Sequence, residues 1–195
     1  MNTYNDIQTS LKKELDKERY IHTLGVAYTA ASMAMCHKED GEKAFLAGLL
    51  HDSAKCISDS DKLQICKDNN IEISPFEVEN PFLLHSKLGA FLAETKYNIL
   101  DKEILSAITY HTTGKPNMTL FEKIIYIADY IEPNRKALPN MEEIRYESFH
   151  NIDKALVLIL ENTIGYLRHQ NRLIEDITLE TYNYYSERLK LCQKN

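Results

Sequence analysis

The spacing of apolar residues is helical along almost the whole chain, and this spacing limits the fold more than any other feature. From Arg19 to Met35, apolar side chains recur every three or four positions, as a helix with one buried stripe requires. That stripe consists of Ile21, Leu24, Tyr28, Ala31 and Met35. No stretch shows the sustained alternation of apolar and polar residues that marks a half-buried strand. We therefore expect an all-α fold without a substantial sheet.

The other expected helices follow from the same pattern. They cover residues 44–54, 83–96, 102–111, 119–131, 152–168 and 179–191. Thr119 and Glu122 have the spacing of a capping box, which predicts a helix start, and Pro133 predicts its end. Residues 57–80 are polar and acidic, so we expect a loop there with one short helix near residues 62–67.

The charge of the chain narrows the classes of function. A net charge of −6 argues against a binder of nucleic acids or anionic membranes, because such proteins carry a basic face. A small phosphorylated substrate stays compatible, since bound metal ions can reverse the field at one site. The amino terminus has no secretory pattern, and the apolar runs are too short to span a bilayer. We expect one cytoplasmic domain covering residues 1–195, with reduced cysteines.

One pair of ionisable residues lies where a hydrophobic core is expected. His51 and Asp52 are adjacent in the expected helix over 44–54, AFLAGLLHDSA, whose lack of a polar face predicts burial on several sides. A buried carboxylate without a partner costs several kcal/mol. Asp52 must therefore be paired, hydrogen-bonded or bound to a cation, and the neighbouring imidazole supplies a neutral nitrogen ligand.

Further ionisable residues recur in the other apolar segments. His22 lies on the preceding helix, His85 opens the next one, His111 ends the one after, and Asp129 lies within IIYIADYI. Taken singly, a buried His is more often a hydrogen-bonded core residue, and a buried Asp a salt-bridge partner. Their joint occurrence with His51 and Asp52 instead indicates a metal site. Mixed imidazole and carboxylate ligands suit iron, manganese, zinc, cobalt or nickel rather than calcium.

The order His, His-Asp, His, His, Asp resembles the HD domain superfamily. Five segments extend the resemblance to the YqeK-type symmetrical bis(5′-nucleosyl)-tetraphosphatases, over residues 15 to 185. These segments are RYIHTLGVA (19–27), AGLLHDSAK (47–55), LLHSKLGA (83–90), AITYHTTGK (107–115) and EKIIYIADYIEPNR (122–135). The resemblance implies a helical HD-domain bundle that hydrolyses diadenosine tetraphosphate to two ADP.

The resemblance also implies a site for two divalent metal ions, iron being the metal such proteins are known for. Asp52 would bridge the two ions. One coordination sphere would be completed by His22, His51 and Asp129, and the other by His85 and His111. A water between two such ions loses its proton near neutral pH and can attack phosphorus.

Three cationic residues stand next to these ligands in the sequence. Lys55 follows Asp52 by three residues on the same expected helix face, Arg19 precedes His22 by three, and Arg135 follows the helix of Asp129. Each could be an ordinary surface charge, but their shared placement favours phosphate contacts, with catalytic roles for Lys55 and Arg135 beside Asp52.

A short segment after His111 has two readings. Thr112, Thr113 and Gly114 fit either a nucleotide contact or a plain helix end equally well. Residues 172–177 depart from the family pattern, which leaves the base preference open.

Two other functions are compatible with parts of the pattern. A mononuclear HD nucleotidase acting on nucleoside mono- or diphosphates would need only His22, His51, Asp52 and Asp129. A nucleotide-binding regulatory module could keep the metal without turnover, although the intact ligand set argues against it. We expect a small dinucleoside polyphosphate or nucleotide as the partner, without nucleic acid or membrane, and the sequence leaves a homodimer open.

Overall fold

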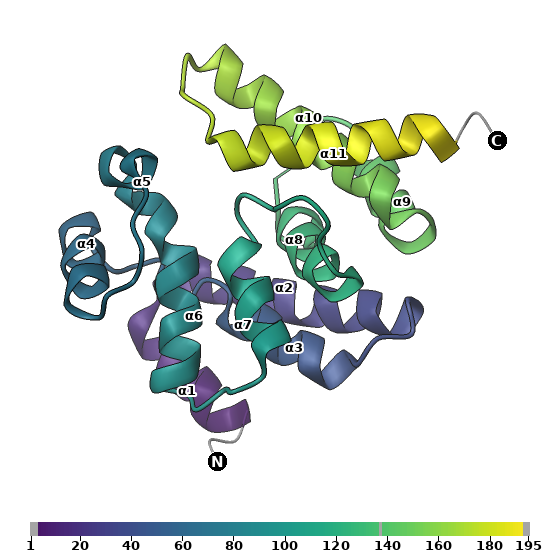
Figure 1. Ribbon diagram of the computed structural model, residues 1–195. Coiled ribbons are helices and arrows are strands. Elements are labelled where there is room, and N and C mark those ends of the chain that lie inside the picture. The colour runs from purple at the N-terminus through teal and green to yellow at the C-terminus, as the bar shows by residue number, and fades with distance from the viewer. Residues whose placement is uncertain (1–3, 137, 193–195) are drawn as a thin grey trace.

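The computed structural model describes residues 4–136 and 138–192, and within these residues the chain is helical without a strand. This confirms the expected all-α fold. Figure 1 shows α2, α3, α7 and α8 grouped together, with α10 and α11 lying beyond α8. The helices are α1 (Tyr4–Glu14), α2 (Lys17–Cys36), α3 (Gly41–Leu50), α4 (Asp59–Asp68), α5 (Pro75–Glu79), a 3-10 turn (Pro81–Leu84), α6 (His85–Thr95), α7 (Lys102–Tyr110), α8 (Leu120–Ile131), α9 (Met141–His150), α10 (Ile152–His169) and α11 (Asp176–Cys192).

The capping box predicted at the start of α8 is present. The Thr119 side chain accepts from the Glu122 backbone N–H at 3.1 Å, and the Glu122 carboxylate accepts from the Thr119 N–H at 2.8 Å. The helix ends at Ile131, two residues before Pro133, as predicted. This fixed start and end set the position of Asp129 along α8.

The predicted buried stripe of α2 is wrong. Ile21, Tyr28 and Met35 are 41%, 63% and 67% exposed. Of the predicted stripe, Leu24 packs partly buried against the core. The buried face carries mostly small, β-branched or polar residues and one large apolar residue, Met33; its members are His22, Thr23, Val26, Ala27, Ala30, Met33 and Ala34. Small side chains let another helix approach closely, so a search for large apolar residues alone selects the opposite side.

Close packing of α2 against α3 depends on Gly48. A Cβ atom on Gly48 would lie 2.8 Å from the Ala27 Cα atom and 3.0 Å from its backbone nitrogen. Because both neighbours are backbone atoms, they cannot rotate away. The glycine therefore permits an approach that brings the end of α3 next to the face of α2 that carries His22.

Residues 57–80 are more helical than expected. The short helix predicted near residues 62–67 is α4, which spans Asp59–Asp68, and α5 follows where a loop was predicted. Ser58 and Ser74 cap these two helices, and Ser74 forms a capping box with Glu77. The full extent of these helices could not be recognised from the sequence, because the segment is polar and α4 buries little apolar surface.

The core consists of one large apolar cluster and one small one. The large cluster contains residues from α1, α2, α3, α7, α8 and α10, and the small one joins Ala54, Cys66, Leu84 and Leu88. Across residues 4–136 and 138–192, no helix combines the length and apolar character needed to cross a membrane.

Candidate metal centre

His51 and Asp52 lie just beyond the end of α3, not inside a helix as the sequence indicated. The helix ends at Leu50, and residues 51–56 form consecutive turns. The backbone N–H of Lys55 donates to the carbonyl of Asp52 at 2.9 Å, so Lys55 returns to the Asp52 side through a turn instead of a helix face. Both His51 and Asp52 are buried, as predicted. The last carbonyl groups of a helix have no hydrogen-bond partner within the helix. One of them, the Gly48 carbonyl, accepts from Nδ1 of His51.

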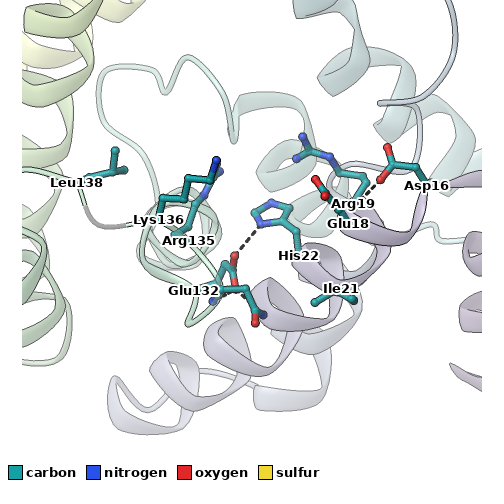
Figure 2. A pocket seen from close by; sticks show the side chains of 10 residues that line it. Asp16, Glu18, Arg19, Ile21, His22, Glu132, Arg135, Lys136 and Leu138 are labelled. Atoms are coloured by element: carbon teal, nitrogen blue, oxygen red, sulfur yellow. Dashed lines mark hydrogen bonds and ion pairs between the residues drawn. The ribbon is translucent and has the colours of Figure 1, made fainter.

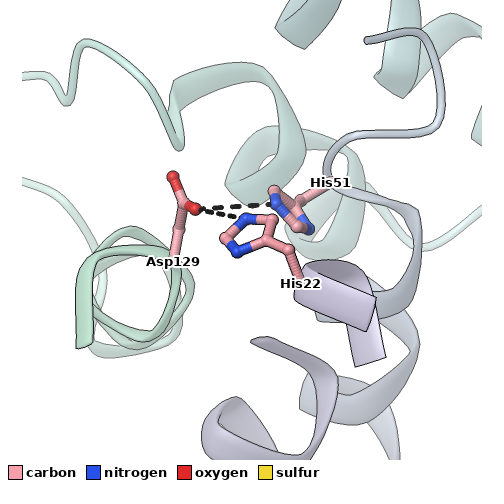
Figure 3. A group of neighbouring side chains, drawn as sticks. All are labelled: His22, His51 and Asp129. Atoms are coloured by element: carbon pink, nitrogen blue, oxygen red, sulfur yellow. Dashed lines mark ion pairs between the residues drawn. The ribbon is translucent and has the colours of Figure 1, made fainter. Parts of the chain in front are cut away.

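Four further residues converge on this pair from different helices. His22 comes from α2, His85 is the first residue of α6, His111 directly follows α7, and Asp129 comes from α8. Figure 3 shows His22 and His51 both turned toward the Asp129 carboxylate. The structure thus brings together all six residues that the sequence singled out as ligands.

The Asp52 carboxylate lies between two groups of side chains. Its Oδ2 atom lies 3.4 Å from His51 Nε2 and 3.9 Å from His22 Nε2. Its Oδ1 atom lies 3.3 Å from His85 Nε2 and 3.6 Å from His111 Nε2. The two carboxylate oxygens therefore face opposite groups, the arrangement that a bridging ligand needs.

Every histidine of the cluster directs the same ring atom inward. His51, His85 and His111 each place Nδ1 within 2.6–2.7 Å of the carbonyl oxygen three residues earlier. A carbonyl only accepts hydrogen bonds, so each Nδ1 carries the proton and each Nε2 presents a lone pair. Metal-binding histidines are held in this way, with the other ring nitrogen donating to a carbonyl or carboxylate.

His22 is held by a carboxylate instead of a backbone carbonyl. Its Nδ1 lies 3.1 Å from Oε1 of Glu132, a residue only 1% exposed. The sequence analysis missed Glu132, because a glutamate directly after a helix and before Pro133 is typical of the surface. The only signal is its position directly after a helix that is apolar almost throughout.

The inward-facing atoms suit a metal ion. Within the described part of the chain, His22 Nε2, His51 Nε2 and Asp52 Oδ1 are buried without a hydrogen-bond partner. His85 Nε2 and His111 Nε2 approach within 3.2 Å although neither carries a proton in this tautomer. Lone pairs facing one another at this distance repel unless a cation lies between them.

The spacing of the ligand atoms agrees with coordination geometry. Atoms about 2.1 Å from one ion lie about 3.0 Å apart in an octahedron and about 3.4 Å apart in a tetrahedron. His22 Nε2 and Asp129 Oδ1 are 2.9 Å apart, and His51 Nε2 is 3.8 Å from the same oxygen. Two sets of three converging ligands occur among the described residues, His22 with His51 and Asp129, and His51 with Asp52 and His111.

The protonation states suit metal ligands. Burial raises the pKa of the Asp52 carboxyl, but His51, His111 and Lys55 outweigh it and hold that pKa well below its usual range. Burial likewise opposes ionisation of Asp129, yet His22 and Arg135 lower its pKa. Burial, reinforced by Lys55, keeps the pKa of His85 well below its usual value. The cluster thus holds ionised carboxylates beside a neutral imidazole.

The three predicted cations all contact the cluster. Arg19 Nη1 donates to Asp52 Oδ2 at 2.7 Å, and Arg135 Nη2 donates to Asp129 Oδ1 at 2.7 Å. Lys55 Nζ lies 3.0 Å from His85 Nε2 and 3.7 Å from Asp52 Oδ1. None of the three is an isolated surface charge.

The segment after His111 divides into two parts. The Thr112 hydroxyl lies 3.1 Å from His85 Nε2 and 3.2 Å from His111 Nε2, within the cluster. Gly114 has a φ of +68°, and its N–H donates to the Tyr110 carbonyl at 2.9 Å. This is the geometry of a glycine that ends a helix. Thr113 donates to the Gly114 carbonyl, so both residues serve the turn.

A pocket of about 640 Å³ opens beside His22. Figure 2 shows Asp16 and Arg19 at one end of it, Leu138 at the other, and Arg135 and Lys136 between His22 and Leu138. The pocket therefore leads from the cluster along a row of basic side chains.

Known proteins are similar to this chain in sequence. The HD domain family pattern matches residues 19–134. The chain is 39% identical to "Bis(5′-nucleosyl)-tetraphosphatase, symmetrical" of Bacillus subtilis, over 89% of this chain and 92% of that protein. It is 36% identical to the Staphylococcus aureus protein of the same name, over 92% and 94%.

A solved structure has the same fold over nearly the whole chain. It is described as a predicted HD superfamily hydrolase involved in NAD metabolism from Clostridium acetobutylicum. Its TM-score is 0.93 at 40% sequence identity, covering 96% of this chain and 99% of that one. Sequence and fold together show that the chain belongs to the HD domain family, in the group that includes the symmetrical bis(5′-nucleosyl)-tetraphosphatases.

Proposed function

We propose that the protein is a metal-dependent phosphohydrolase that cleaves diadenosine tetraphosphate symmetrically into two ADP. The observation that carries this proposal is the convergence of four imidazoles and the Asp129 carboxylate on Asp52, where two ring nitrogens and one carboxylate oxygen are buried without a hydrogen-bond partner. The names of the relatives from Bacillus subtilis and Staphylococcus aureus support the substrate.

The cluster is proposed to hold two divalent metal ions. His22, His51 and Asp129 would bind one, His85 and His111 the other, and Asp52 both. Iron is the first candidate, and manganese, cobalt, nickel and zinc have ligand preferences that also fit. When bound, such a pair supplies Lewis-acid polarisation of phosphoryl oxygens and a hydroxide at neutral pH.

The cations around the cluster are proposed to orient the phosphate chain. Arg19, Lys55 and Arg135 now contact metal-ligand side chains, and each lies within reach of a phosphate bound next to the cluster. Guanidinium groups bind phosphate oxygens through two parallel hydrogen bonds, which fixes direction as well as position. The Thr112 hydroxyl adds one neutral donor on the His85 side.

Product analysis tests the reaction directly. The purified protein should convert diadenosine tetraphosphate to ADP alone, with two molecules formed from each substrate. ATP plus AMP would mean attack at a different phosphorus, and adenosine plus phosphate would mean a nucleotidase. Either result contradicts the proposed reaction.

The metal requirement is tested with Asp52→Ala. This variant should lose both metal ions and activity, because Asp52 faces both groups of ligands. Asp68→Ala is a matched control, since Asp68 is an exposed aspartate at the end of α4 whose carboxylate accepts from the exposed Gln64 side chain. Full activity of Asp52→Ala would exclude the proposal.

The variant His111→Ala distinguishes a two-metal site from a one-metal site. A two-metal site predicts that this variant keeps about one metal ion per chain and loses most turnover. Unchanged activity with one ion per chain in the unmodified protein would instead indicate the mononuclear nucleotidase type.

A further inference from the structure

A second hollow of about 500 Å³ lies next to the pocket beside His22. We call it the α8–α10 recess, and its lining includes Tyr130, Leu138, Pro139, Asn162, Gly165 and Tyr166. Leu138 lines both hollows, at the end of the first pocket farthest from Asp16 in Figure 2. Tyr130 also directly follows Asp129 in α8. The recess therefore continues the path that begins at the metal ligands.

Gly165 has no packing reason to be a glycine. It lies inside α10, where glycine costs about 1 kcal/mol relative to alanine. A Cβ atom placed on Gly165 would meet no atom within 4 Å, and its φ is not in the left-handed region. The absent side chain leaves the floor of the recess open, which suggests that something other than the protein uses this space.

The remaining lining suits a flat aromatic ring with a polar edge. Tyr166 lines the recess and is 58% exposed, so its ring is open to a ligand. The Asn162 amide donates to the Tyr130 hydroxyl at 3.2 Å and to the Pro139 carbonyl at 2.8 Å, so its orientation is fixed and its oxygen can accept a hydrogen bond. Small-molecule sites combine mainly apolar walls with a few such fixed polar groups.

We propose that the α8–α10 recess binds one nucleoside of the dinucleoside polyphosphate, with its base against Tyr166 and over Gly165. This inference rests on the proposed function. Symmetrical cleavage breaks the central bond, so one base is separated from the reacting phosphorus by one further phosphate and a ribose, and the other base by two phosphates and a ribose. A base must then bind outside the metal cluster, and Arg135 and Lys136 line the intervening pocket for the phosphates.

Fluorescence gives a test of binding that does not depend on turnover. The chain contains no tryptophan, so Tyr166→Trp introduces a single indole at the recess. Adding ADP to the metal-loaded variant should change its emission, because the adenine stacks on the new ring. Arg168→Trp is the control, since Arg168 lies on the same turn of α10 outside the recess lining. An equal response from both variants, or none from Tyr166→Trp, would overturn the inference.

Steady-state kinetics gives the second test. Gly165→Trp fills the recess, and Tyr166→Ala removes the stacking ring in case the larger side chain disturbs folding, which thermal unfolding reports. Loss of base stacking should raise the KM for diadenosine tetraphosphate roughly 5- to 150-fold with kcat nearly unchanged. The Arg168→Trp variant should keep the KM of the unmodified protein.

The two proposals fail in different ways. If the unmodified protein cleaves the substrate to two ADP but Gly165→Trp and Tyr166→Ala keep its KM, only the recess is excluded. If the unmodified protein does not cleave the substrate, the proposed function fails and the inference fails with it.

Discussion

A single methyl group should weaken the metal centre without touching a ligand. Gly25 lies one turn after His22 on α2, and a Cβ atom there would be 2.3 Å from Oε2 of Glu132. The Glu132 carboxylate would have to withdraw by about 1 Å to reach an ordinary contact distance. Its other oxygen is the hydrogen-bond partner of His22 Nδ1, so Gly25→Ala displaces the group that orients the imidazole.

The carboxylate has little freedom to absorb this shift. Glu132 is buried, and Oε2 accepts from the Asn134 backbone N–H at 2.7 Å and from its side chain at 3.0 Å. Loss of a group that orients a metal-bound histidine costs about 10- to 100-fold in metal affinity or activity, or about 1.4–2.7 kcal/mol. Alanine also favours the helix by about 0.5–1 kcal/mol, which offsets part of any loss in folding stability.

The assay therefore compares metal affinity with stability. Metal retained after dialysis against graded chelator, kcat/KM and the thermal midpoint would be measured for Gly25→Ala and for Gly41→Ala. Gly41 is a fair control because its added Cβ meets the exposed, flexible Met35 side chain at 3.1 Å. Affinity and kcat/KM should fall at least 10-fold in Gly25→Ala alone. If Gly25→Ala matches the unmodified protein in both, Glu132 does not orient His22 and the reasoning is refuted.

Three further outcomes follow from the packing and charges. Gly48→Ala crowds the Ala27 backbone and should lower the unfolding free energy by about 1–3 kcal/mol, measured by denaturant titration; an unchanged midpoint would contradict the close approach of α2 and α3. Burial and Glu77 raise the pKa of Glu175 in the folded chain, so the fold loses stability as the pH rises from the pKa of the unfolded chain through that raised pKa. Glu175→Gln should therefore raise the thermal midpoint at pH 7, and this gain should vanish below about pH 4, where the carboxyl is protonated in the unfolded chain too. Removing metal with a chelator should lower the midpoint of the unmodified protein, because metal binds the folded chain selectively; equal midpoints with and without chelator would count against the centre.

The helices could be predicted from the sequence because their limits are local signals. The capping box of Thr119 and Glu122 acts within one turn, and Pro133 stops a helix whatever surrounds it. Which face of α2 is buried was not predictable in the same way. That face depends on how close α3 can come, and Gly48 on α3 sets this distance. The burial of this face depends on both helices, so the sequence of α2 alone does not show it.

The candidate ligands could be predicted because they break a local rule. Asp52 and Asp129 are ionisable residues in apolar segments, and a core would exclude them unless they had a partner. A glutamate such as Glu132 is ordinary at the end of a helix, so the sequence does not mark it. Only its contact with His22 in the structure shows that it belongs to the site. The turn that holds His51 was also hidden, because apolar residues continue past the last helical hydrogen bond.

The carboxylates of the cluster connect metal binding with substrate binding. Arg19 and Arg135 donate to Asp52 Oδ2 and Asp129 Oδ1, which are also the proposed metal-ligand atoms. We expect these oxygens to bind the metal ion in the loaded protein, so that Arg19 and Arg135 would compete with it for the carboxylates and would be freer to bind phosphate. We therefore expect a chain with a net charge of −6 to bind a polyphosphate at this cluster more tightly with metal bound than after chelation, which a binding titration of ADP with and without chelator would measure.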